Sequence, residues 1–361
     1  MTVKRKIGLA LLALLLIGGA LLYAFRPWLA ERAFQRGLDT TVGVDLSLAL
    51  GDGLHAYVCG SGSPMPDAAR AGPCLAVLAG DKAFVFDAGA GSIRKLGRMG
   101  FPMDKLQAAF LTHLHSDHFD GLGELLLQAW IAGGRSAPLP VYGPEGTDRL
   151  IAGLMMTYEA DKGFRIAHHG PAIARPGGFG GEPHVIAFDQ TDTDADGVVY
   201  QGGGVTIRAV EVDHAPIAPA FGYRIDYKGR SIVISGDTVY SAPLEYTAKG
   251  ADLLVHEALN KRMVARLGAA LAWRGRKDTA QIMTDIQNYH ATPEDAARLA
   301  KAAGVKTLLL THLVPAPPAK LLEPMFLGGA PKIFPGVRLA HDGMIVSLPA
   351  GSREVRFSEG L

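Results

Sequence analysis

The chain has 361 residues, of which 48% are hydrophobic, with 45 glycines, 22 prolines and a formal net charge of +1. This length allows one large domain or two average ones, and the composition is typical of an α/β protein with many tight turns. The near-zero net charge, without a basic stripe interleaved with aromatic residues, predicts no dedicated nucleic-acid surface.

The N-terminus carries an apolar segment behind a basic flank. Lys4, Arg5 and Lys6 precede residues 7–25, which contain no charged side chain. This segment is long enough to cross a bilayer, and the flank predicts a cytoplasmic N-terminus. The alternative is a cleaved signal peptide with a weak small-residue site at 18–20. Because apolar residues continue to Phe25, we favour an uncleaved signal anchor over residues 1–30. In both cases we expect the body to be membrane-anchored facing the periplasm, or exported.

Cys59 and Cys74 are the only cysteines in the sequence. An oxidising compartment would allow a disulfide that closes the Pro/Gly-rich loop between them. The alternative is two buried free thiols. Metal binding by this pair is not expected, because the two residues are not spaced as a ligand pair.

Apolar runs and turn residues predict alternating strands and helices from residue 54 onward. We predict strands at 55–59, 75–78, 83–87, 106–111 and 139–143, and helices at 92–99, 121–130 and 147–159. Residues 169–204 predict an irregular insertion or a hairpin-rich rim. Strands follow at 205–212, 221–227, 231–235, 253–256 and 307–311, near 338 and at 344–348, with a helix at 293–303. We expect a linker over 31–53, one domain over 54–349 and a C-terminal tail over 350–361.

Residues 112–121 read Thr-His-Leu-His-Ser-Asp-His-Phe-Asp-Gly and are the most informative segment of the chain. Three imidazoles and two carboxylates lie close together between a predicted strand and a predicted helix, a pattern typical of a divalent-metal site. The alternative is a polar loop, or a helix start capped by Asp117. Surface loops seldom collect so many ligand side chains, so we predict a metal site, with Asp120 as a helix-start residue.

More polar residues follow later predicted strands, where the ligands of an α/β sandwich would lie. They are His214, Asp237, His256, Glu257 and His312. One histidine at a strand end is usually a satisfied hydrogen-bonding group. The repetition of this pattern after the histidine-rich segment predicts that several of these residues share the metal site.

The pattern resembles the metallo-β-lactamase superfamily from about residue 54 to residue 349, which implies an αββα sandwich, a single α/β domain after the N-terminal membrane segment. The resemblance rests on Thr112-His113-x-His115-x-Asp117-His118, followed by His214, Asp237 and His312. Further motifs resemble the branch that contains ribonuclease Z and the zinc-dependent arylsulfatases. They are Gly60-Ser61-Gly62-Ser63-Pro64, Asp87-x-Gly89, Val141-Tyr142-Gly143-Pro144, Ser235-Gly236-Asp237-Thr238, His256-Glu257-Ala258 and His290-Ala291-Thr292-Pro293.

The resemblance implies two metal ions per chain. His113, His115 and His214 would hold one ion, Asp117, His118 and His312 the second, and Asp237 would bridge both. Neutral imidazoles with carboxylates suit Zn²⁺, and Mn²⁺ or Fe²⁺ stay open. Two ions that share a water would make hydroxide available near neutral pH.

Three residues are expected to have catalytic roles. Asp117 would orient the nucleophile, and His290 would stabilise a developing oxyanion or protonate the leaving group. The alternative for His290 is a structural hydrogen bond at the start of a helix. Glu257 would orient His290 as an outer carboxylate.

One departure from the branch narrows the expected function. Ribonuclease Z enzymes that mature transfer RNA usually carry a protruding arm between the third histidine and the bridging aspartate, or take it from a partner domain. In this chain, the sequence of residues 221–235 predicts a plain hairpin without such an arm. We therefore expect a hydrolase of phosphodiesters or sulfate esters that acts on a small anionic ester, with ribonuclease Z-type endonuclease action least favoured. The membrane would be its other partner, and a homodimer stays open.

Two rival functions are kept. The same nucleophile can attack a carbonyl carbon, which would make the protein a lactonase or a β-lactamase. A non-enzymatic scaffold is the other rival, but degenerate scaffolds usually lose ligands and this chain retains all seven. The pocket walls are expected from 160–204 and 260–287.

Overall fold

The computed structural model describes residues 3–188 and 197–360. It divides into two units, residues 1–46 and residues 47–361. The first unit contains one helix, α1 (Val3–Thr41), which is long and apolar enough to cross a membrane, with a window of mean hydropathy 2.5. Part of the expected 31–53 linker is therefore helical, because residues 28–36 contain good helix formers and no glycine or proline.

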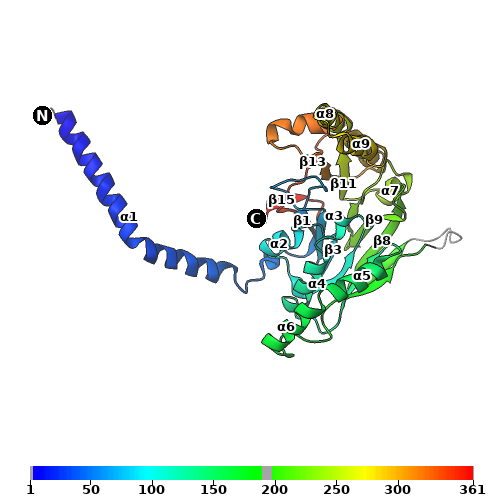
Figure 1. The fold of residues 1–361 in the computed structure, drawn as a ribbon, viewed down its shortest axis with the longest axis horizontal. Helices are drawn as coiled ribbons and strands as arrows, with labels where there is room; N and C mark the ends of the chain where they lie inside the picture. Colours follow the sequence, from blue (N-terminus) through cyan, green and yellow to red (C-terminus); the bar gives the residue numbers. More distant parts are fainter. Residues whose placement is uncertain (1–2, 189–196, 361) are drawn as a thin grey trace. The chain divides into compact units, whose positions relative to one another are not determined.

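The second unit is built on two mixed β-sheets (Figure 1). The first has the strand order β15-β14-β1-β2-β3-β4-β5-β6. Its strands are β1 (Gly53–Gly60), β2 (Cys74–Ala79), β3 (Lys82–Phe86), β4 (Leu106–Phe110), β5 (Leu139–Gly143), β6 (Gly181–Val185), β14 (Met344–Pro349) and β15 (Arg356–Glu359). From β3 to β6 neighbouring strands are parallel.

The second sheet has the order β13-β12-β11-β10-β9-β8-β7. Its strands are β7 (Val198–Gly202), β8 (Val205–Val212), β9 (Ala220–Tyr227), β10 (Arg230–Ile234), β11 (Leu253–Leu259), β12 (Leu308–Val314) and β13 (Arg338–Leu339). Strands β10 to β13 are parallel, and β9 and β10 form a tight hairpin. Because the carboxyl ends of parallel strands lie at one edge of a sheet, residues that follow β10 and β12 are brought together.

The main core lies between the two sheets and combines side chains of both, such as Phe84, Phe110 and Val346 from one and Tyr223 and Ile232 from the other. Apolar clusters on the outer faces pack helices against each sheet, which gives four layers. The helices are α2 (Ser92–Arg98), α3 (Ser116–Phe119), α4 (Leu122–Ile131), α5 (Thr147–Thr157), α6 (Glu159–His169), α7 (Ala242–Thr247), α8 (Lys261–Trp273), α9 (Lys277–Asp285), α10 (Pro293–Ala303), α11 (Glu323–Leu327) and α12 (Ala330–Ile333). The predicted αββα sandwich is confirmed.

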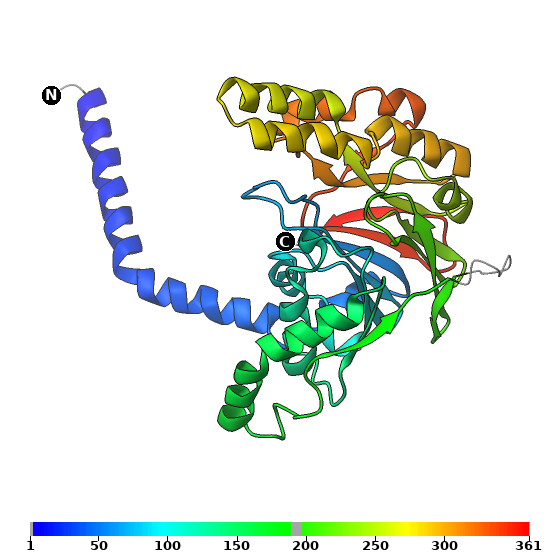
Figure 2. The ribbon, with the colours of Figure 1, turned by 45° about the vertical axis from the view of Figure 1, so that its right-hand side comes forward.

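Several local features differ from expectation. Residues 169–204 contribute β6 and β7, each paired with a neighbouring strand. The expected C-terminal tail contains β15, which pairs with β14 through backbone hydrogen bonds that the sequence pattern does not reveal. Residues 260–287 form the helical hairpin α8–α9, which lies beyond the edge of the second sheet in both ribbon views (Figure 2). The disulfide between Cys59 and Cys74 agrees with expectation, and the Cα atoms of the two residues are 5.1 Å apart.

Candidate metal centre

The seven residues expected to bind metal come together at one edge of the sandwich. They lie in the loop after β4 and in α3, after β8, after β10, and within β12. Their ligand atoms form overlapping groups of three, each within 4.8 Å: His113, His115 and His214; His113, His118 and Asp237; and Asp117, His118 and His312. A fourth group adds His290, which was not an expected ligand, to Asp237 and His312.

The Asp237 carboxylate lies at the centre of these groups. Its Oδ2 atom is 3.4 Å from Nε2 of His118 and 3.4 Å from Nε2 of His312. The same oxygen is 4.0 Å from Nε2 of both His113 and His214. Asp237 thus faces both halves of the cluster, as a bridging ligand would.

A β-bulge turns His312 toward the cluster. In the β11–β12 ladder, Glu257 pairs with Thr311 and Ala258 pairs with Leu313, so that His312 is the extra residue. Its backbone is left-handed, with φ of 45°, which is strained for a residue with a bulky side chain. Strain of this kind persists where surrounding structure imposes it, and it commonly marks functional positions.

Unpartnered buried nitrogen atoms and a bound proton indicate that the cluster can hold a metal ion. Nε2 of His118 and Nε2 of His214 are buried without a hydrogen-bond partner, which is costly unless another ligand satisfies them. Burial lowers the pKa of His118, but the carboxylates of Asp237 and Asp87 outweigh burial and raise it well above its usual value. The metal-free site therefore holds a proton where a divalent cation would bind, and the donor set suits Zn²⁺.

Asp87 is a site residue whose role the sequence did not reveal. Its Oδ2 accepts a hydrogen bond from Nδ1 of His118 at 2.8 Å, and its two oxygens accept from the backbone N–H and the hydroxyl of Thr112, each at 2.8 Å. Such an outer carboxylate fixes the ring and tautomer of a ligating histidine. The sequence signal that could have pointed to Asp87 is the Asp87-x-Gly89 motif. The structure explains its glycine, because a Cβ on Gly89 would lie 2.4 Å from the backbone oxygen of Asp117.

His290 and Glu257 form a buried pair beside Asp237. Oε1 of Glu257 is 3.0 Å from Nδ1 of His290, and it also accepts the backbone N–H of Ala291 at 2.9 Å. Burial lowers the pKa of His290, but the nearby Glu257 carboxylate and its hydrogen bond outweigh burial and raise the pKa to about 9. The metal-free protein thus holds His290 protonated at neutral pH. The Glu257 side chain is directed at His290, as the sequence predicted.

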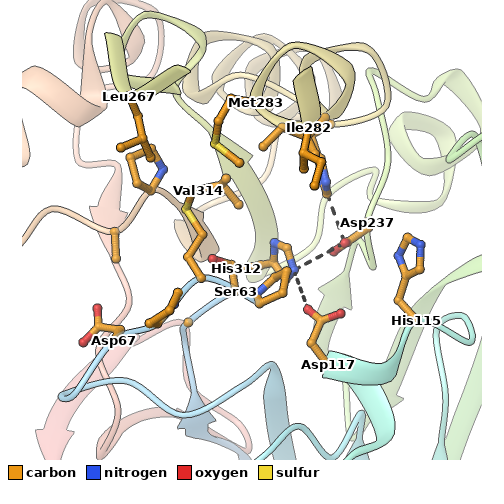
Figure 3. A pocket seen from close by; sticks show the side chains of 18 of the residues that line it. Ser63, Asp67, His115, Asp117, Asp237, Leu267, Ile282, Met283, His312 and Val314 are labelled. Carbon is orange, nitrogen blue, oxygen red and sulfur yellow. Dashed lines mark hydrogen bonds and ion pairs between the residues drawn. The ribbon is translucent and has the colours of Figure 1, made fainter. Parts of the chain in front are cut away.

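The cluster forms the floor of a cavity of about 730 Å³ (Figure 3). Asp117, Asp237, His290 and His312 line its floor, and α8, α9 and the 62–67 loop line much of the rest. The expected wall from 160–204 is wrong for residues 160–188 and 197–204, none of which lines the cavity, and β6 instead extends the first sheet beside β5. Residues 189–196 lie outside the described residues. The expected wall from 260–287 is confirmed.

Comparisons with known proteins agree with this geometry. Residues 82–313 match the family model described as beta-lactamase superfamily domain. Over 265 residues the chain is 40% identical to a protein named Ribonuclease Z from Mycobacterium avium, and 38% identical to one of the same name from Mycobacterium bovis. Each alignment covers 73% of this chain and 87% of the relative.

Solved structures share the fold. The metallo-β-lactamase fold protein YhfI of Bacillus subtilis is 22% identical with a TM-score of 0.58, and the match covers 82% of this chain and 100% of that one. The short form of human tRNase Z is 23% identical with a TM-score of 0.56, over 82% of this chain and 99% of that one. At these identities the likeness establishes the fold alone.

Proposed function

Because this chain belongs to the metallo-β-lactamase superfamily, in its ribonuclease Z branch, we propose that it hydrolyses phosphodiester bonds of RNA at the metal centre described above. The observation that supports this most is the convergence of two ligand groups on Asp237, whose carboxylate faces both. Hydrolysis is the activity of the superfamily, and RNA is the substrate that the name of the relatives indicates.

The sequence-based prediction about partners is therefore corrected. A small anionic ester as substrate and the lack of a nucleic-acid surface conflict with relatives named Ribonuclease Z at 40% identity. The prediction rested on the net charge of +1, a sum that does not report where charges lie, and on the plain hairpin at 221–235. The structure has this hairpin as β9–β10, but the relatives named Ribonuclease Z show that it does not rule out RNA as the substrate. Ribonuclease action, which we had ranked last, becomes the favoured function, and the sulfate-ester alternative has no support among the relatives.

The side chains suggest a division of roles. We propose that two Zn²⁺ ions would be held by His113, His115 and His214 on one side and by Asp117, His118 and His312 on the other, with Asp237 between them. When bound, the ions would supply an activated water and positive charge against the phosphoryl oxygens.

Two further roles belong to the protein's own groups. Asp117 lines the cavity floor, where its free lone pairs can accept a hydrogen bond from the attacking water. His290 lines the same floor and is held by Glu257 through Nδ1, so its Nε2 is the atom that can deliver a proton to the departing oxygen. Since the 5′ or 3′ oxygen of RNA is a poor leaving group without a proton, this step favours cleavage of phosphodiesters by an acid in this position.

We also propose that α1 anchors the chain in a membrane with the hydrolase unit outside the cytoplasm. The basic residues before the apolar segment and the disulfide between Cys59 and Cys74 support this orientation. Extraction of membranes with alkaline carbonate should leave the chain in the pellet. Added protease should reach the hydrolase unit only in spheroplasts with the outer face exposed.

The test of the function uses the full-length chain in detergent, loaded with Zn²⁺. We expect cleavage of a mixed-sequence RNA and of a 3′-extended transfer RNA precursor, and loss of cleavage with EDTA. His290→Gln is the diagnostic variant, and Gln281→Asn, outside the cavity, is its matched control. If the loaded protein cleaves a cephalosporin or a lactone but neither RNA, the proposal is wrong.

A further inference from the structure

The cavity has a polar floor and an apolar roof. Five apolar side chains of the α8–α9 hairpin and its exit line the cavity and form the roof. They are Leu267, Leu271, Ile282, Met283 and Ile286. Figure 3 shows three of them, Leu267, Ile282 and Met283, across the cavity from Asp117 and Asp237. Pro64, Met65 and Val314 extend this apolar surface down the side walls.

The charges around the cavity disfavour a second phosphate next to the roof. Among the described residues that line the cavity, none is a lysine or an arginine, and Asp67 adds negative charge at one wall. An anionic group next to the roof would lose its hydration without gaining a cation partner. The roof therefore favours an uncharged group beside the scissile phosphate.

The roof leaves apolar surface open to a ligand. Ile282 is 52% exposed and Leu267 is 36% exposed, although both line a concave surface. Exposed apolar side chains that gather in a concavity commonly mark a binding site. Thr279 is the one polar side chain that α8 and α9 contribute to the described lining, so the roof offers little for hydrogen-bond recognition.

Local contacts hold the roof in place before any ligand binds. Asn260 caps α8 by accepting the backbone N–H of Met263 at 2.9 Å, and its amide donates to the carbonyls of Met325 and Phe326 at 3.1 and 2.8 Å. Met283 of α9 packs with Val264 of α8 and with Val314 in one buried cluster. A preformed apolar wall binds a planar group with little ordering cost.

We propose that this roof binds the base of a nucleotide adjoining the scissile phosphate, through apolar contact and without reading its sequence. The inference rests on the proposed function and deepens it. Tyr289 also lines the cavity, and its aromatic ring lies next to those of His290 and His214. It provides a face on which a base can stack, and stacking of this kind tolerates any base.

The first experiment measures binding without turnover. Calorimetry on the Zn²⁺-loaded full-length chain compares phenylphosphonate with methylphosphonate, which carry the same anionic group and have no ester to hydrolyse. We expect phenylphosphonate to bind at least about tenfold more tightly. In Ile282→Asn the ratio should fall toward one, while Gln281→Asn, the neighbouring residue outside the cavity, should keep it. Equal affinities in the wild-type chain, or an unchanged ratio in Ile282→Asn, would overturn the apolar site.

The second experiment identifies the occupant. An RNA with one abasic ribose on either side of its cleaved bond is compared with the parent RNA. Removal of the base on the side that enters the cavity should lower kcat/KM about tenfold or more, and Ile282→Asn should cleave both RNAs alike. If abasic and parent RNAs are cleaved equally while the phosphonate ratio holds, a base is not the occupant. Failure to cleave any RNA would refute the proposed function instead, and the phosphonate ratio would still test the roof.

Discussion

Nδ1 of His290 donates a hydrogen bond to Oε1 of Glu257 at 3.0 Å, and both side chains are buried. The same carboxylate oxygen accepts the backbone N–H groups of Ala291 and Thr238, at 2.9 and 3.3 Å. Three donors on one oxygen fix the carboxylate, and the carboxylate fixes the ring. The pair therefore ties β11 to the segment before α10 and directs His290 into the cavity.

Glu257→Gln should change how the stability of the metal-free chain depends on pH. The folded-state pKa of His290, about 9, lies above its unfolded value near 6.5, so the bound proton stabilises the fold fully below pH 6.5. That stabilisation declines as pH rises and is lost above pH 9. The wild type should exceed Glu257→Gln by at most about 3 kcal/mol at pH 6, and the difference should shrink toward pH 9.5.

Urea unfolding in EDTA at several pH values measures this difference. Glu245→Gln is the matched control, because Glu245 is bonded to Tyr240, whose pKa is raised to about 12 by that hydrogen bond. The control should give a difference that does not vary between pH 6 and 9.5. A difference for Glu257→Gln that grows with pH would show that the pair does not hold the proton.

The convergence of the proposed ligands could be predicted because most of them follow a strand with a clear apolar pattern. His113, His214 and Asp237 come after β4, β8 and β10. β8 and β10 are both antiparallel to β9, so they run in the same direction and their carboxyl ends lie at one edge of the second sheet. His312 was also predicted from its strand, but the bulge that turns it inward could not be, since it depends on pairing between β11 and β12.

Other features depend on contacts between distant segments and left no periodic signal. The link from Asp87 to His118 spans 31 positions, and the direction of the α8–α9 hairpin follows from the contacts of Asn260 with the segment near Phe326. The apolar roof could not be predicted from the sequence for the same reason. Its residues read as the buried face of two amphipathic helices, which is the more common meaning of such a pattern.

Asp87→Asn should weaken metal binding without unfolding the chain. Asparagine tolerates the left-handed backbone at this position, where φ is 55°, but its neutral amide no longer stabilises the His118 ring as a carboxylate does. We expect Zn²⁺ affinity at the His118 side to fall about 10- to 100-fold. Competition with a chromogenic chelator measures it, and Asp226→Asn in β9 serves as control. Unchanged affinity would show that Asp87 only supports the loop.

Asp237→Asn should lower the number of bound metal ions. Asp237 is the one carboxylate that faces both ligand groups, and its amide would neither bridge two cations nor balance their charge. Metal analysis after dialysis should give about two ions per wild-type chain and at most about one per variant chain. Binding should also release protons, because His118 holds one in the metal-free site. If the variant retained two ions per chain, Asp237 would not be a bridging ligand.

Reduction of the disulfide between Cys59 and Cys74 should destabilise the chain and loosen one wall of the cavity. The bridge closes a segment with a sequence separation of 15, for which the chain-entropy contribution is about 3 kcal/mol. Residues 62–67 of this segment line the cavity, so phenylphosphonate should bind more weakly after reduction. Asp342 still accepts the backbone N–H groups of Ser61 and Ala71, at 2.9 and 2.6 Å, and should keep the segment attached.

Urea midpoints and calorimetry with and without a phosphine reductant measure both effects, and the double variant Cys59→Ser, Cys74→Ser should not respond to the reductant. An equal response of wild type and double variant would mean that the reductant acts elsewhere, for example by removing metal.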